Sequence, residues 1–111
     1  MTGEPGVDGN TALEKYAETL DDLSEPERLR RLDILRAFAT FVERTPDRMV
    51  DELFDRVTMK YRKRGYYTER IKAFTEQVEG PRSTKVFSGN VIRAFFIANG
   101  LRIPPEKPSW M

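Results

Sequence analysis

Apolar residues recur at helical spacing through most of the chain. Between residues 24 and 44 they fill about half of a helical wheel, and polar residues fill the other half. Ser24 is placed to cap this segment, and Pro26 falls in its first turn. The pattern predicts an amphipathic helix whose apolar half faces a core.

A second helix is predicted to begin after Thr45, which precedes Pro46 and suits an N-cap. Its apolar residues repeat as far as Tyr61. The basic run 60–64 then falls at its expected end, with Gly65 as terminator. Cations in a last turn complement the helix dipole, so part of this run is explained without any ligand.

Two more helices are predicted, one over 68–79 and one from a Ser83 or Thr84 cap to Gly100. A short acidic segment, 11–23, could form an additional N-terminal helix.

No window alternates polar and apolar residues over the length of a strand, although Tyr66-Tyr67 could be locally extended. We expect one domain over 11–105, a disordered lead over 1–10, and the start of a linker or tail over 106–111. The fold class is therefore predicted to be all-α, a bundle of four main helices with an optional N-terminal helix.

Cysteine and histidine are absent, which removes disulfides, thiolate metal sites and the commonest general base. No apolar run approaches the roughly 20 residues that span a bilayer, and the N-terminus lacks the basic start and apolar segment of a secretory signal. We expect a cytoplasmic protein with no metal, no cofactor, no small-molecule substrate and no membrane partner.

Charge is divided unevenly along the chain. Residues 1–59 carry 14 acidic and 8 basic side chains, whereas residues 60–111 carry 4 acidic and 11 basic ones. The basic part is a candidate footprint for phosphate. The alternative is that its lysines and arginines simply solvate one surface.

The last predicted helix is apolar over a broad arc and should occupy the centre of the bundle. Along its remaining edge, Arg82, Lys85, Gly89 and Arg93 recur three or four residues apart. Gly89 should be exposed there, where a missing side chain lets a backbone approach. The free N–H groups at the helix start suit an anion. These residues could form a surface that contacts DNA. They could equally be a solvent-exposed face of the helix on which a glycine is tolerated.

The order of these helices is one basis for a resemblance to a known family, and the segment VIRAFF at 91–96, followed by Asn99-Gly100-Leu101, is the other. Both resemble the N-terminal core-binding (SAM-like) domain of the tyrosine recombinase, or phage integrase, family. The likeness covers about residues 11–105 and rests mostly on packing positions. It implies a small orthogonal bundle that forms half of a clamp around double-stranded DNA during DNA integration and recombination. It also implies contacts with other recombinase protomers.

In that family a separate domain carries the catalytic residues, and none of them can be placed in this chain. The resemblance therefore implies a DNA-binding domain, excised or stand-alone, that is not itself an enzyme. The family's DNA contacts, carried over by position, fall on Arg28, Arg31, Lys60, Arg62, Lys63, Arg64, Arg70, Arg82, Ser83, Thr84, Lys85, Gly89 and Arg93.

Two other classes of protein remain as alternatives. One is a helical protein-interaction module that docks a partner on the surface Phe95-Phe96-Ile97 and does not bind nucleic acid. The other is an independent small enzyme, which the lack of any convergent catalytic constellation disfavours.

Overall fold

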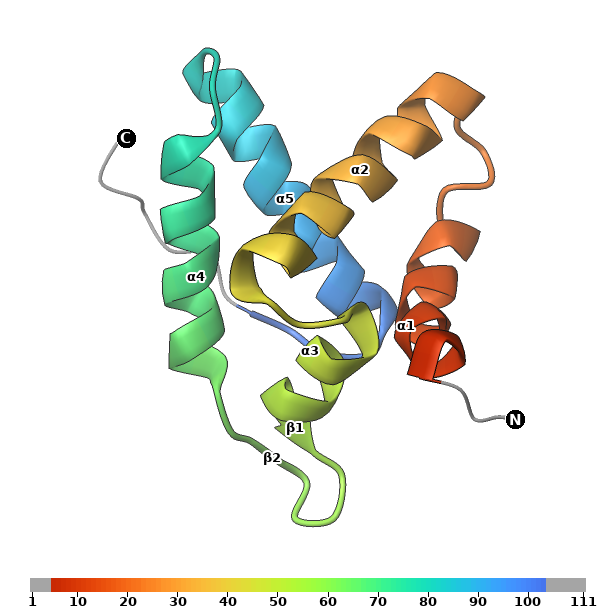
Figure 1. Cartoon of the computed structure of the whole chain (residues 1–111), viewed down its shortest axis with the longest axis vertical. Helices are drawn as coiled ribbons and strands as arrows, with labels where there is room; N and C mark the ends of the chain where they lie inside the picture. Colours follow the sequence, from red (N-terminus) through yellow and green to blue (C-terminus); the bar gives the residue numbers. More distant parts are fainter. Residues whose placement is uncertain (1–4, 104–111) are drawn as a thin grey trace.

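In the described part of the chain, five α-helices and one short β-hairpin make up the fold (Figure 1). The computed structural model describes the backbone of residues 5–103 and the side chains of residues 11–103. In chain order the elements are α1 (Pro5–Glu18), α2 (Glu25–Val42), α3 (Pro46–Leu53), β1 (Phe54–Asp55), β2 (Lys60–Tyr61), α4 (Arg64–Gln77) and α5 (Arg82–Ala98). The all-α prediction is confirmed only in its coarse form, because the described residues are mostly helical but include a two-stranded hairpin that was not predicted. Within the described part of the chain, no helix has the length and apolarity of a membrane span.

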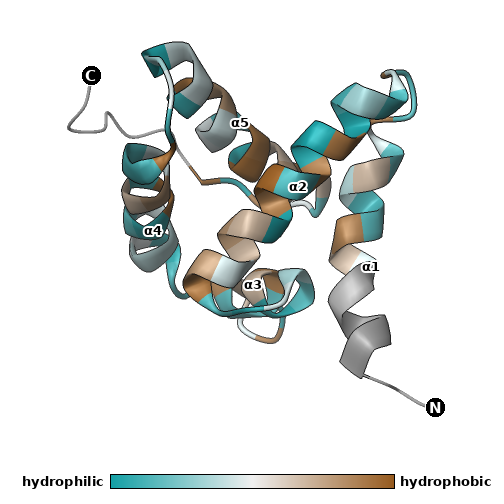
Figure 2. Cartoon of the chain, turned by 45° about the horizontal axis from the view of Figure 1, so that its top comes forward, coloured by the Kyte–Doolittle hydropathy of each residue, from teal (hydrophilic) through white to brown (hydrophobic). Residues whose placement is uncertain are grey.

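Helix α5 lies at the centre of the molecule, where α2 crosses it and α1 and α4 flank it (Figure 1). Phe95 and Phe96 are fully buried. The ring of Phe95 meets the edge of Tyr16 on α1 at 6.2 Å, and the ring of Phe96 meets Tyr67 on α4 at 5.8 Å. Hydrophobic stretches of α2 and α5 come together at their crossing (Figure 2). The prediction that the last helix occupies the core is confirmed.

Two of the predicted caps are present. The Oγ of Ser24 accepts the N–H of Glu27 at 3.4 Å, and the Oγ1 of Thr45 accepts the N–H of Arg48 at 3.2 Å. Each hydroxyl satisfies a backbone donor that the first helical turn leaves unpaired. The starts of α2 and α3 are therefore determined locally.

The predicted cap of α5 was wrong. Pro81 is the N-cap, so Ser83 and Thr84 lie inside the first turn, and no side chain caps the helix. Proline restricts its own φ to the value that a helix start requires, so the chain turns into α5 two residues before the hydroxyls.

The single helix predicted from Thr45 to the basic run was also wrong, because α3 ends at Leu53 and a hairpin follows. The Oδ1 of Asp55 accepts the N–H of Val57 at 2.8 Å, which offers the backbone an alternative to helical hydrogen bonds. Phe54 pairs with Tyr61 across the two strands, and their rings meet at 5.0 Å. This aromatic pair is available only to a chain that turns back.

Helix α4 begins at Arg64, four residues before the predicted start at Thr68. Gly65 therefore lies in the first turn of α4 and terminates nothing, and Tyr66 and Tyr67 are helical, not extended. The basic run occupies a strand and a helix start. Its expected role at a helix C-terminus, where cations complement the dipole, does not apply.

Helix α1 begins within the segment 1–10, which we expected to be disordered. It is held to the rest of the fold by two long-range hydrogen bonds. The backbone N–H of Ala12 donates to Asp47 Oδ1 at 2.6 Å, and the Nδ2 of Asn99 donates to the carbonyl of Ala12 at 3.1 Å. The expected linker 106–111 lies outside the described residues.

The C-terminal end of α2 offers a test of backbone strain. Glu43 follows the helix with φ +59°, a left-handed conformation that side chains disfavour and glycine does not. We expect Glu43→Gly to raise the free energy of unfolding by about 0.5–1 kcal/mol in urea denaturation. Glu43→Ala is the control, because it removes the same charge and keeps the strain. Equal stability of the two variants would contradict this explanation.

Candidate nucleic-acid interface

Five exposed cations gather on the hairpin and the first turn of α4, toward the lower end of Figure 1. This hairpin patch consists of Arg56, Lys60, Arg62, Lys63 and Arg64. Within the described part of the chain, the side chains of Arg56 and Lys60 have no ion pair or hydrogen bond. Arg62 lies 3.5 Å from Asp55, yet its side chain is 66% exposed. The carboxylates of Asp55 and Glu52 offset part of the charge of Arg62 and Lys63, whereas Arg56 and Lys60 have no such counter-charge in contact.

The base of the hairpin is attached firmly to the body of the protein. The guanidinium of Arg64 lies 3.9 Å from the centre of the Tyr61 ring, and Phe54 packs on the same ring. The Oη of Tyr61 also accepts the backbone N–H of Arg102 at 3.0 Å. The hairpin is thus held both by α4 and by the segment that follows α5.

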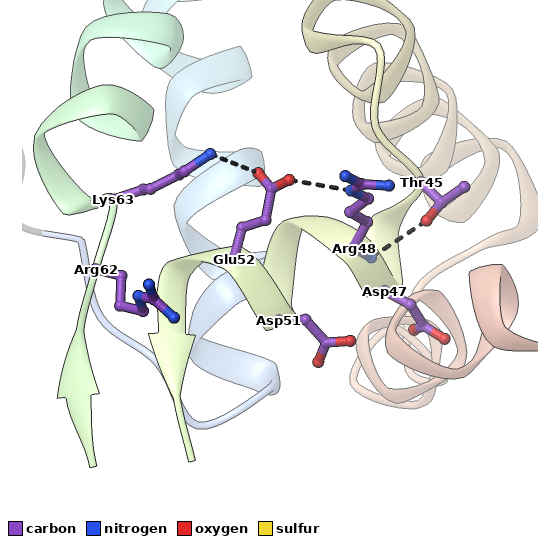
Figure 3. Close-up of a pocket in the computed structure, with 7 residues that line it drawn as sticks. All are labelled: Thr45, Asp47, Arg48, Asp51, Glu52, Arg62 and Lys63. Atoms are coloured by element: carbon purple, nitrogen blue, oxygen red, sulfur yellow. Dashed lines mark hydrogen bonds and ion pairs between the residues drawn. The ribbon is translucent and has the colours of Figure 1, made fainter. Parts of the chain in front are cut away.

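Glu52 on α3 joins the elements around the hairpin through one carboxylate that is only 14% exposed. Its Oε2 accepts the Nε–H groups of Arg44 at 2.9 Å and Arg48 at 3.0 Å, and its Oε1 accepts the hydroxyl of Tyr67 at 3.0 Å. The ammonium of Lys63 lies 3.7 Å away (Figure 3). One side chain therefore links the α2–α3 turn, α3 itself and α4.

The environment of Glu52 favours its charged form. Burial acts to raise the pKa of this carboxyl, but hydrogen bonds from Arg48, Arg44 and Tyr67 outweigh it and lower the pKa to about 2. At the other end of the bond, burial and the hydrogen bond to Glu52 raise the pKa of the Tyr67 hydroxyl well above its usual range. Tyr67 is therefore a neutral donor at physiological pH.

A shallow groove of about 480 Å³ opens beside this network (Figure 3). It is lined by Thr45, Asp47, Arg48, Asp51, Glu52, Arg62 and Lys63. Three acidic side chains face three basic ones, so the groove favours neither an anion nor a cation. Among the described residues, no group of three carboxylates is placed to hold a metal ion. The hairpin patch adjoins this groove through Arg62 and Lys63, but the acidic side chains of the groove do not suit phosphate.

The cationic edge predicted on α5 belongs largely to the interface with α4. The Nζ of Lys85 donates to the backbone carbonyls of Val78 at 2.5 Å and Glu76 at 3.0 Å. These carbonyls lie at the C-terminal end of α4, where helical partners run out and the dipole attracts a cation. Lys85 is consequently committed to holding α4 against α5.

The expectation that Gly89 is exposed was wrong, because it is buried between α4 and α5. A Cβ at this position would lie 3.4 Å from Thr75 Cγ2 on α4 and 3.1 Å from the Nη2 of Arg93. The missing side chain admits a neighbouring helix of the same protein. Arg93 is half-buried and donates to Asn90 at 3.1 Å, and burial lowers its pKa.

The arginines predicted on α2 and α4 also have internal partners. Arg28 donates to a backbone carbonyl of the preceding turn at 2.8 Å, and Arg31 pairs with Glu27 at 2.6 Å. The guanidinium of Arg70 lies over the ring of Phe41, 5.6 Å from its centre. These contacts reduce the charge that the three arginines offer to an external anion.

The remaining predicted residues lie at the start of α5. Arg82 and Ser83 are exposed there, and Thr84 is half-buried. Helix α4 separates them from the hairpin patch, and its 14 residues correspond to about 20 Å (Figure 1). The structure thus brings Lys60, Arg62, Lys63 and Arg64 together but leaves the α5 group at the other end of α4.

Arg56 is the one member of the hairpin patch that the sequence analysis missed. It was assigned to the interior of a helix and to the acidic half of the chain. The available signal was Asp55 followed by the β-branched residues Val57 and Thr58, since such residues favour turns and strands over helix interiors.

The Glu52 network predicts a specific dependence of stability on pH. Because the pKa of Glu52 falls from 4.5 to about 2 on folding, its contribution is present above pH 5 and is lost as the pH falls toward 2. We expect Glu52→Gln to lower the free energy of unfolding at pH 7 by about 2–3 kcal/mol, and to flatten its pH dependence between pH 5 and 2.

Urea denaturation at several pH values measures this effect. The control is Asp33→Asn, which removes an acidic group whose ion pair with Arg36 is long, at 3.6 Å, and highly exposed. This control should remain within about 0.5 kcal/mol of the parent. A Glu52→Gln protein as stable at pH 7 as the control would refute the central role of Glu52.

Comparisons with known proteins add no family assignment to this geometry. No protein-family model, no curated protein and no solved structure matches the chain.

Proposed function

We propose that this chain is a DNA-binding domain that holds duplex DNA through the hairpin patch and carries no catalytic residues. We further propose that it is a core-binding domain of the SAM-like type from a site-specific tyrosine recombinase. Its partners would be double-stranded DNA and other recombinase protomers. It would act in the cytoplasm without a cofactor.

The observation that carries the proposal is the hairpin patch itself. Some arginines and lysines elsewhere in the molecule are engaged by carboxylates or carbonyls, as with Arg31, Arg44 and Lys85. In the patch, Arg56 and Lys60 have no such partner among the described residues. A cluster of exposed cations on a rigid projection suits a polymer of regularly spaced phosphates.

The position of the acidic residues also supports this orientation. Residues 1–27 carry 8 acidic and 1 basic side chain. Helix α1 lies on the opposite side of the view from α4 (Figure 1). Repulsion would turn the α1 side away from DNA and leave the α4 and hairpin side facing it.

The recombinase assignment rests on the order of the helices and on the segment 91–96 at the centre of the fold. The burial of Phe95 and Phe96 in α5 is compatible with the packing role of the family's motif. The hairpin between α3 and α4 is an addition that the resemblance does not explain.

The same burial removes the surface on which the protein-interaction alternative depended. Phe95 and Phe96 are both 0% exposed, so only Ile97, at 56%, is available to a partner. A single exposed residue is normal on a protein surface and does not make a docking site.

Neutralising two unpaired cations tests DNA binding directly. We expect Arg56→Gln/Lys60→Gln to weaken binding to a labelled 20-bp duplex by roughly tenfold near 0.1 M salt. The log–log salt slope should fall by about 2, because each phosphate contact contributes about 0.9. Fluorescence anisotropy across a salt series gives both quantities.

The matched control is Lys15→Gln/Arg36→Gln, which removes the same charge from exposed positions on α1 and α2. It should bind nearly as the parent does. Equal losses in the two double variants would mean that overall charge, not the hairpin patch, determines binding. Absence of binding by the parent at low salt would overturn the proposed function.

A further inference from the structure

The tip of the hairpin exposes two apolar side chains in the middle of the hairpin patch. Val57 is 92% exposed and Met59 is 68% exposed, more than any other large hydrophobic residue in the described part of the chain. Arg56 precedes them and Lys60 follows. Exposing apolar area to water is unfavourable, so a pair of such residues at the end of a projection indicates a binding surface.

The tip is ordered by its own backbone contacts. Asp55 Oδ1 accepts the N–H groups of Val57 and Thr58 at 2.8 and 3.3 Å, and the carbonyl of Asp55 accepts the N–H of Met59 at 2.7 Å. Met59 has φ +60°, a left-handed conformation that residues with side chains rarely adopt. The fold therefore presents Met59 outward despite both local strain and exposure.

The charges around the tip indicate the chemistry of its partner. Arg56 and Lys60 flank the two apolar side chains in the sequence, and Arg62 follows directly after β2. The carboxylate of Asp55 accepts backbone donors through Oδ1, and its Oδ2 lies 3.5 Å from Arg62. A complementary surface has anionic rims on either side of a recess that offers apolar contacts. The major groove of DNA has this form, with phosphates at its edges and thymine methyl groups on its floor.

The dimensions of the hairpin select the major groove over the minor one. A two-stranded ribbon is about 5 Å between strands before its side chains are counted. The major groove is about 12 Å wide and admits such a ribbon, whereas the minor groove is about 6 Å wide.

We propose that the hairpin enters the major groove, with Val57 and Met59 against base edges and Arg56 and Lys60 against phosphates. This rests on the proposed DNA binding and names the element that reads the groove. Since Val57 and Met59 carry no charge, they contribute affinity that does not depend on counterion release.

The test replaces both apolar side chains without weakening the fold. Val57→Thr keeps the shape and β-branching of valine, and Met59→Asn places at φ +60° a residue that tolerates this conformation. We expect the double variant to melt no lower than the parent. We also expect it to bind the labelled duplex about tenfold more weakly, with an unchanged salt slope. The control is Leu29→Thr/Ile97→Asn, which changes exposed apolar residues on α2 and α5 and should bind as the parent does.

Competition identifies the groove. Methyl green, which occupies the major groove, should displace the parent protein, whereas netropsin, which occupies the minor groove, should not. Displacement by netropsin alone would overturn the placement. A parent that binds duplex with the same affinity as Val57→Thr/Met59→Asn would overturn the inference and leave the proposed function intact.

Two further outcomes separate the inference from its premise. If the parent fails to bind duplex at any salt concentration, both the proposed function and the inference fail. If the parent instead sediments with phosphatidylserine vesicles and the double variant does not, the tip is a membrane-binding element, and the groove proposal is overturned.

Discussion

The carboxylate of Glu52 is the interaction on which the arrangement of the hairpin depends. It receives hydrogen bonds from the α2–α3 turn, from its own helix and from Tyr67 on α4. The hairpin leaves α3 directly after Leu53 and returns to the start of α4, so both of its ends are attached to elements that Glu52 holds together. Loss of this carboxylate would leave Arg44 and Tyr67 without their shared acceptor inside the fold.

Several cations in the basic part of the chain make contacts inside the molecule. Lys85 on α5 binds a carbonyl at the C-terminal end of α4, Arg93 is half-buried, and the guanidinium of Arg64 lies over the ring of Tyr61. A cation near a helix end or an aromatic face has a structural reason to be there. The hairpin patch differs because five exposed cations lie close together in it, and its outer members, Arg56 and Lys60, have no such partners among the described residues.

Among the described residues, two other than glycine have positive φ, and the cause differs between them. Glu43 ends α2, where a left-handed residue pairs its N–H with the last carbonyls of the helix. Met59 lies in the turn of a hairpin, where asparagine or glycine would serve the backbone better. An exposed apolar side chain in a strained position is consistent with selection for a contact outside the fold.

Local signals in the sequence were enough to determine the helical class, the Ser24 and Thr45 caps and the central place of α5. Caps and apolar periodicity act within a few residues of one another, so a linear pattern contains them. The break after Leu53 and the burial of Gly89 were decided only by the tertiary structure. The hairpin gains its aromatic pair only when the chain folds back, and Gly89 is covered only because α4 packs there. Such contacts depend on partners distant in the sequence, which override local helix propensity.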